Sequence, residues 1–176
     1  MLNRIVTVVN SGLEYEADQR HAKIMMRDTG IDGGSKGAVT PGSNGEGGPE
    51  FGGDRNESKF RAVAARGNYL AQDRMDIQFA AKEVSRFTSR PEDQDWRAAK
   101  RLARYLKDRR RVVLEYKYQQ LPNKVVVWSD TDFAGCGRTR KSTSGGVVML
   151  GSRADLDWFR GVIQRRMKVK FNARLE

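Results

Sequence analysis

The stretch from Val125 to Ser152, VVVWSDTDFAGCGRTRKSTSGGVVMLGS, constrains the fold most, because strand formers, acids, bases and glycines follow one another in it in a definite order. Residues 125–128 are β-branched or aromatic and lie between turn-forming residues, which is typical of a short buried strand. A second apolar run, residues 147–150, follows Gly145 and Gly146. The order predicts a strand, a basic loop and a second strand, paired antiparallel.

Two acids stand at the expected end of the first strand. Asp130 falls where that strand ends and Asp132 lies two residues later, so in extended chain both carboxylates point to one face. A carboxylate held at the end of a buried strand, beside a cleft, suits a divalent metal ion. Asp130 is therefore a candidate metal ligand, and the alternative is an aspartate that only shapes a turn.

The loop between the two strands alternates cations with hydroxyls. Such a mixture suits the oxygens of a phosphate group. The residues predicted to bind nucleic acid here are Arg138, Arg140, Lys141, Ser142 and Thr143.

Several stretches resemble parts of one protein family. WSDTDFAG followed by TRKSTSGGVVMLGS resembles the opening of the ribonuclease H domain in the Pol polyprotein of copia-type retrotransposons. NYLAQDRMDIQFAAKEVSRF and DWRAAKRLARYLKD resemble the helical segment that joins reverse transcriptase to ribonuclease H in these polyproteins, and LEYEADQRHAKIM resembles the end of the reverse transcriptase. The resemblance follows the family's own order, and it fails from about residue 32 to 56 and again after Trp158.

The resemblance implies a truncated piece of a polymerase–nuclease polyprotein in four parts. Residues 1–30 would be a remnant of the reverse transcriptase, 31–56 a Gly-rich flexible linker, 57–121 the helical connection and 122–176 a partial ribonuclease H-like domain. The implied fold class is α+β, with an incomplete ribonuclease H-like sheet. Loss of its later strands would leave apolar surface uncovered and favour self-association.

The resemblance also implies a role for Asp130 as a catalytic and metal-binding residue. Ribonucleases of this family cut the RNA of an RNA/DNA hybrid with Mg²⁺ or Mn²⁺ ions, which several carboxylates hold together. The acidic sequence Ser-Ser-x-Glu-Ala-Glu expected after Trp158 is absent. The catalytic set is therefore incomplete, and we expect little or no nuclease activity from this chain alone.

Charge points to a polyanionic partner. Lys and Arg number 33 and Asp and Glu 22, which gives a net charge of +11, and nucleic acid, as a hybrid or a duplex backbone, is the first partner to consider. A helix expected over residues 92–107 carries Arg97, Arg101 and Arg104 away from its apolar stripe. This basic face either follows a phosphate backbone or is an ordinary solvated helix surface.

The remaining pattern predicts the other elements. Strands are expected over residues 2–9, 112–118 and 156–163. Helices are expected over residues 15–27, from Ser58, and from Asp73 or Asp76 to Phe87. A single cysteine, Cys136, cannot form an internal disulfide, and no run approaches the roughly 18 apolar residues of a membrane span. An intracellular location follows as an expectation, without a choice between cytoplasm and nucleus.

Three functions remain open at this point. The first is a Pol fragment without full catalytic activity of its own. The second is a basic nucleic-acid-binding module. The third is a metal-dependent nuclease for RNA/DNA hybrids, in which Glu176 or a partner chain supplies the acids that the chain lacks.

Overall fold

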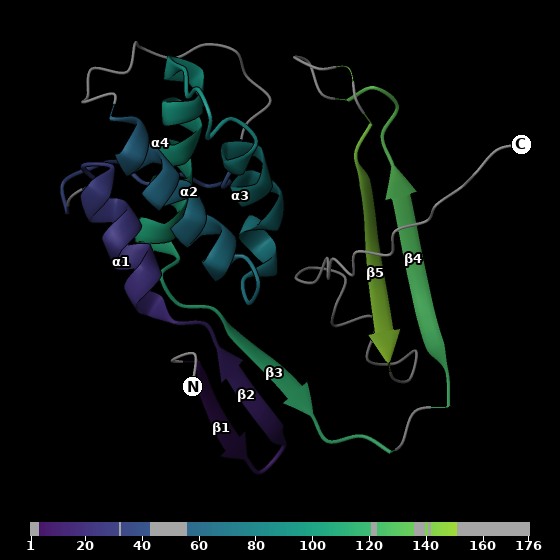
Figure 1. Ribbon diagram of the computed structural model, residues 1–176. Coiled ribbons are helices and arrows are strands. Elements are labelled where there is room, and N and C mark those ends of the chain that lie inside the picture. Colours follow the sequence, from purple (N-terminus) through teal and green to yellow (C-terminus); the bar gives the residue numbers. More distant parts are fainter. Residues whose placement is uncertain are drawn as a thin grey trace, which may run out of the picture. The chain divides into compact units, whose positions relative to one another are not determined.

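In the computed structural model, two strands near the start of the chain and one from its middle form a sheet. β1 (Ile5–Val9) and β2 (Gly12–Glu16) make a hairpin, and β2 pairs on its other edge with β3 (Val113–Lys117); both pairings are antiparallel (Figure 1). A Cβ atom on Gly12 would lie 2.0 Å from the carbonyl oxygen of Tyr116. Glycine at this position therefore lets β3 approach β2 closely.

The structure describes residues 4–31, 33–42, 56–120, 123–135, 140 and 142–150. The chain divides into two units, Met1–Tyr118 and Gln119–Glu176. The first contains the three-stranded sheet and the helices, and the second contains a β-hairpin. The α+β class is confirmed. The ribonuclease H-like sheet and the domain boundaries at residues 30, 56 and 121 stay predictions.

Helices account for most of the regular secondary structure described in the first unit. In the described residues they are α1 (Gln19–Asp28), α2 (Glu57–Leu70), the 3-10 turn η1 (Met75–Ile77), α3 (Gln78–Ser85) and α4 (Asp93–Asp108). None of these described helices is both long and apolar enough to cross a membrane. The helical segments expected from the apolar spacing are present, with changed ends.

The helix predicted from Tyr15 is wrong at its start. Tyr15 lies in β2, where its ring meets that of Tyr116 edge-on, and α1 begins only after Asp18, whose carboxylate accepts a hydrogen bond from the backbone of Arg20. The segment GLEYE alternates as a strand does, with Leu13 and Tyr15 on one face. Tyr15 therefore belongs to this alternating strand segment, and the helical spacing of apolar residues begins only after it.

The helices enclose a main hydrophobic core, with a small second cluster of Met26, Ile31 and Ala103. Phe60 of α2 and Trp96 of α4 are fully buried, and their rings meet edge-on with centroids 5.1 Å apart. Gly67 lets α1 lie close to α2, because a Cβ atom there would sit 3.4 Å from the methyl group of Met25. The apolar stripe predicted for α4 is buried as expected: Trp96, Ala99, Ala103 and Leu106. Burial of this stripe fixes which face of α4 points outward.

A buried ion pair lies at the junction of α2, η1 and α4. The guanidinium group of Arg74, 1% exposed, donates to both carboxylate oxygens of Asp76, at 2.8 and 2.6 Å. The Tyr105 hydroxyl donates to the same carboxylate at 2.9 Å, and Arg74 also donates to the carbonyl oxygen of Arg110. Burial raises the pKa of Tyr105, and the charge of Asp76 raises it further. These contacts join three segments through one charged cluster.

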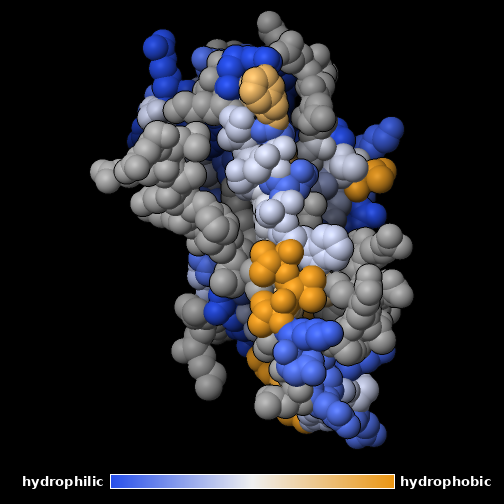
Figure 2. Space-filling model, turned by 90° about the vertical axis from the view of Figure 1, so that its right-hand side faces the viewer, coloured by the Kyte–Doolittle hydropathy of each residue, from blue (hydrophilic) through white to orange (hydrophobic). Residues whose placement is uncertain are grey.

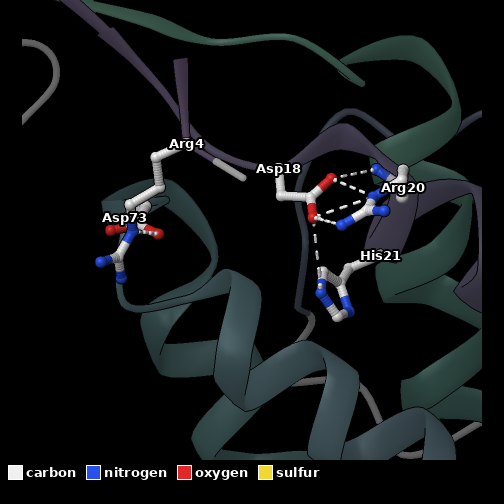
Figure 3. A network of polar contacts seen from close by, with 5 residues as sticks. All are labelled: Arg4, Asp18, Arg20, His21 and Asp73. Atoms are coloured by element: carbon white, nitrogen blue, oxygen red, sulfur yellow. Dashed lines mark hydrogen bonds and ion pairs between the residues drawn. The ribbon is translucent and has the colours of Figure 1, made fainter. Parts of the chain in front are cut away.

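Polar contacts also connect the sheet to the helices (Figure 3). Arg4 and the Tyr15 hydroxyl both bond the carboxylate of Asp73, at 2.7 and 2.6 Å. Burial and the hydrogen bond to Asp73 raise the pKa of Tyr15 to about 12.

A second polar cluster lies at the start of α1, where the Asp18 carboxylate points to both Arg20 and His21. Burial would raise the pKa of Asp18, but the hydrogen bonds from Arg20 lower it below its usual value.

The first part of the predicted linker contacts α4. Residues 33–42 accept hydrogen bonds from basic side chains of α4 and from Arg109, which follows it, and Ala38 packs against the core. This part of the predicted linker therefore packs on α4, and the assignment of residues 31–56 as a flexible linker stays a prediction. Residues 43–55 lie outside the described residues.

Candidate functional site

The hairpin predicted around Asp130 is present in the second unit. β4 (Val125–Thr131) pairs antiparallel with β5 (Ser144–Leu150), which confirms the strand, loop and strand expected from the sequence. The strand expected over residues 156–163, with Trp158, lies outside the described residues.

The prediction that β4 is buried is wrong for the described residues. Val125 and Val127 are each 61% exposed on one face of the strand, and Trp128 is 60% exposed on the other. The reason is that a two-stranded sheet has no layer of its own to cover either face. Hydrophobic side chains accordingly appear at the surface shown in Figure 2. The expected self-association through such surface stays a prediction.

Asp130 lies one residue before the end of β4 and is exposed. Its partner across the hairpin is Gly145, which has no side chain, and a Cβ atom there would meet no atom within 4 Å. The carboxylate of Asp130 is therefore exposed on a strand that pairs with one neighbour. The sequence predicted instead that this strand is buried in the centre of a sheet.

Asp132 has a structural role in the loop. Its carboxylate accepts a hydrogen bond from the backbone N–H of Thr143, and its own N–H donates to the carbonyl oxygen of Thr143 at 3.0 Å. A Cβ atom on Gly135 would lie 2.3 Å from the Asp132 carboxylate, so glycine is needed where the loop turns back. Asp132 therefore closes the hairpin loop, as aspartates do in turns.

The acids of the hairpin do not complete a two-metal centre. No group of three or more His, Cys, Asp or Glu side chains that could hold a metal ion is found in the described part of the chain. Two-metal hydrolysis needs several carboxylates around ions about 3.5–4 Å apart. The described residues therefore do not fit the expected Mg²⁺ or Mn²⁺ pair, and metal binding by Asp130 stays a prediction.

The basic loop is described in part. Arg138 and Lys141 lie outside the described residues. Arg140 is exposed, with a backbone φ of 52°, in the left-handed region that glycine prefers. The Ser142 hydroxyl accepts a hydrogen bond from the backbone of Ala134 at 3.1 Å. Ser142 and Thr143 thus bond within the loop, and their predicted contact with phosphate stays a prediction.

A second group of predicted residues lies on α4. Arg97, Arg101 and Arg104 follow one another at helical spacing on the face opposite the buried stripe. Arg104 is exposed, while Arg97 and Arg101 are partly covered. The structure pairs none of these three guanidinium groups with a carboxylate of the described residues. Among the described residues no carboxylate neutralises their charge, although the guanidinium group of Arg101 donates a hydrogen bond to the uncharged hydroxyl of Thr40.

Other basic residues, at the end of α4 and just after it, already have partners in the structure. Arg111 donates to the buried carboxylate of Glu16 at 2.7 Å, so it serves the junction with the sheet. Lys107 and Arg109 bond carbonyl oxygens of residues 33–39. The sequence shows the positive charge of these residues but contains no signal for these partners, since the partners lie far away along the chain.

Comparisons with known proteins give matches over about half of the chain. An uncharacterized mitochondrial protein of Arabidopsis thaliana is 34% identical over 96 residues, which are 53% of this chain and 39% of that protein. The secreted RxLR effector protein 161 of Plasmopara viticola is 35% identical over 96 residues, 54% of this chain and 67% of that protein. A retrovirus-related Pol polyprotein from transposon RE2 of Arabidopsis thaliana is 31% identical over 94 residues, 53% of this chain and 6% of that polyprotein.

No protein-family model matches the chain, and no solved structure matches it. The match covers well under two thirds of the mitochondrial protein and a small part of the Pol polyprotein. The identity to the transposon polyprotein agrees with the resemblance found in the sequence. These matches support the identification of the chain as a fragment of a retrotransposon Pol polyprotein.

Proposed function

We propose that the chain corresponds to the part of a copia-type Pol polyprotein that runs from the end of the reverse transcriptase, through the connection helices, into the start of ribonuclease H. We propose further that it binds a nucleic-acid backbone without hydrolysing it. The similarity to a transposon Pol polyprotein supports the origin. The order of the resembling segments, from LEYEADQRHAKIM to WSDTDFAG, supports the finer assignment.

The observation that carries the binding proposal is the basic face of α4. Arg97, Arg101 and Arg104 project from the side of the helix that does not enter the core. A row of cations on a rigid helix can neutralise successive phosphates without any contact to the bases. With a net charge of +11 on the chain, this face supports binding to the backbone of a hybrid or duplex without sequence preference.

Binding to an RNA/DNA hybrid should weaken steeply as salt rises. If three phosphates are neutralised, affinity is expected to fall about 40-fold between 50 and 200 mM salt, because bound counterions are released on association. Fluorescence anisotropy of a labelled hybrid at several salt concentrations measures this slope. Affinity that is indifferent to salt would contradict the proposal.

Variants of α4 identify the surface. The double variant Arg97→Gln/Arg104→Gln is expected to reduce the slope of log affinity against log salt by about 1.8, from about 0.9 for each phosphate contact. The matched control is Arg61→Gln on α2, whose guanidinium group is paired with Glu57 at 2.7 Å. A slope that changes equally in the control and in the double variant would place binding elsewhere.

Nuclease activity is expected to be absent from the chain by itself. Purified protein, incubated with labelled hybrid and Mg²⁺ or Mn²⁺, should leave the hybrid intact, because one open carboxylate cannot hold two ions. The variant Asp130→Asn separates contamination from activity. Cleavage by the original protein that disappears in Asp130→Asn would favour the metal-dependent nuclease over the binding module.

A further inference from the structure

Residues 33–42, which we name the strap, lie on the basic residues in and just after α4. Lys107 donates its ammonium protons to the carbonyl oxygens of Gly33, at 2.8 Å, and Ser35. Arg109 donates to the carbonyl oxygen of Val39 at 3.1 Å. The strap therefore lies along basic side chains that belong to the predicted nucleic-acid surface or adjoin it.

The end of the strap contacts a residue already assigned to that surface. Arg101 Nη2 donates to the hydroxyl of Thr40 at 2.8 Å, and this hydroxyl donates to the carbonyl oxygen of Gly42 at 2.9 Å. Farther back, Gly37 lies so close to Asp108 that a Cβ atom would fall 1.6 Å from the carboxylate. The strap is thus seated closely on this part of the helix.

The oxygens that the strap offers are all uncharged. Carbonyl and hydroxyl oxygens accept hydrogen bonds from the cations but do not neutralise them, whereas a phosphate does both. The fit is also incomplete, because Arg101 Nε is buried and finds no acceptor among the described residues. A polyanion would therefore be a better partner for Arg101, Lys107 and Arg109 than the strap.

We propose that the strap occupies phosphate positions on α4 and competes with nucleic acid for them. Backbone phosphates replace the strap oxygens at Arg101, Lys107 and Arg109, and the strap leaves the helix. Without a polyanion, the strap therefore covers these three basic side chains. This inference rests on the proposed function, since it describes how the same surface is regulated.

Loosening the strap should tighten binding. Thr40→Val removes the hydroxyl that Arg101 and Gly42 share, while the side chain keeps its shape. We expect affinity for the labelled hybrid to rise about threefold, the effect of one ordinary hydrogen bond. Thr40→Ser keeps a hydroxyl and is the matched control, with unchanged affinity. Equal affinities for the Val and Ser variants would overturn the proposal.

Strengthening the strap should weaken binding. Gly33→Asp adds a carboxylate beside Lys107, in a place where a Cβ atom would meet nothing within 4 Å. We expect an approximately threefold loss of affinity beyond that of Ser58→Asp, which makes the same charge change at an exposed position of α2. Equal losses in the two variants would mean that the added charge acts only at long range, which overturns local competition.

Hydrogen exchange observes the strap directly. Backbone amides of residues 33–42 should exchange faster when the hybrid is bound, because the strap has been displaced. Slower or unchanged exchange with the hybrid bound would overturn the proposal that nucleic acid displaces the strap, while leaving the binding proposal intact. Binding only by Thr40→Val would support the strap as an inhibitor. If no variant bound the hybrid, both proposals would fall together.

Discussion

Replacing Arg74 with methionine is expected to lower the free energy of unfolding by about 3–5 kcal/mol, the range for removing one partner of a buried ion pair. Arg74 is 1% exposed, and its loss removes two hydrogen bonds and a positive charge from the carboxylate of Asp76. The carbonyl oxygen of Arg110 loses a donor as well. Because the side chain of Asp76 is 22% exposed, we expect the lower end of the range. Urea unfolding followed by circular dichroism measures it.

The dependence of the free energy of unfolding on pH, measured under acid conditions, tests the Arg74–Asp76 ion pair independently. Burial would raise the pKa of Asp76, but hydrogen bonds and charge from Arg74, with the Tyr105 hydroxyl, lower it below its usual value. A carboxyl whose pKa is lower in the folded state stabilises the fold above its unfolded pKa of about 4, and this stability is lost as the pH falls toward the folded value. The variant without Arg74 should therefore lose less stability on acidification than the original protein.

The control for this experiment is Arg27→Met. Arg27 forms an ion pair with Asp28 at 2.9 Å, but its side chain is 74% exposed. Exposed pairs of this kind contribute at most about 1 kcal/mol. Equal losses in the Arg74 and Arg27 variants, or equal acid dependence with and without Arg74, would show that the buried pair does not stabilise the fold.

Replacing Trp96 with alanine is expected to destabilise the first unit by about 3–5 kcal/mol, as in other cores that lose a large aromatic side chain. Trp96 is 1% exposed and packs edge-on against Phe60, so its removal leaves a cavity between α2 and α4. Domains of this size are stable by only about 5–15 kcal/mol. We therefore expect the variant to be close to unfolding, which thermal and urea denaturation will show.

Trp128→Ala is the matched control for Trp96→Ala. Trp128 lies on β4 in the second unit and is 60% exposed. Its removal should change the unfolding of the first unit by less than about 0.5 kcal/mol, as for most surface substitutions. A cost comparable to that of Trp96→Ala would mean that Trp128 is covered in solution by some part of the chain or by another molecule.

The helices could be predicted because their information is local. Trp96, Ala99, Ala103 and Leu106 recur at helical spacing, and each is buried on the face where that spacing places it. The pairing of β2 with β3 could not be predicted in the same way. Many strands are compatible with a short alternating segment, and only packing between distant parts of the chain selects one.

For the candidate site, the sequence predicts the order of strand, loop and strand. It does not predict how far their side chains are buried or which hydrogen bonds they make. The run from Val125 to Trp128 shows that a strand could be buried, but it does not show that another layer covers it. The loop residues Asp132 and Ser142 could likewise be identified as polar from the sequence, whereas their bonds to Thr143 and Ala134 depend on where the loop closes. Sequence patterns therefore identified the right segments and left their partners open.

The pairing of β2 with β3 has a consequence for synthesis on the ribosome. β2 is made early, while β3 emerges only after nearly all of the first unit has been translated. Until then one edge of the nascent hairpin has no partner, and Val6 and Val8 on β1 remain largely exposed even afterwards. During translation the hairpin thus presents both an unpaired edge and apolar side chains, and the first unit can complete its folding only late.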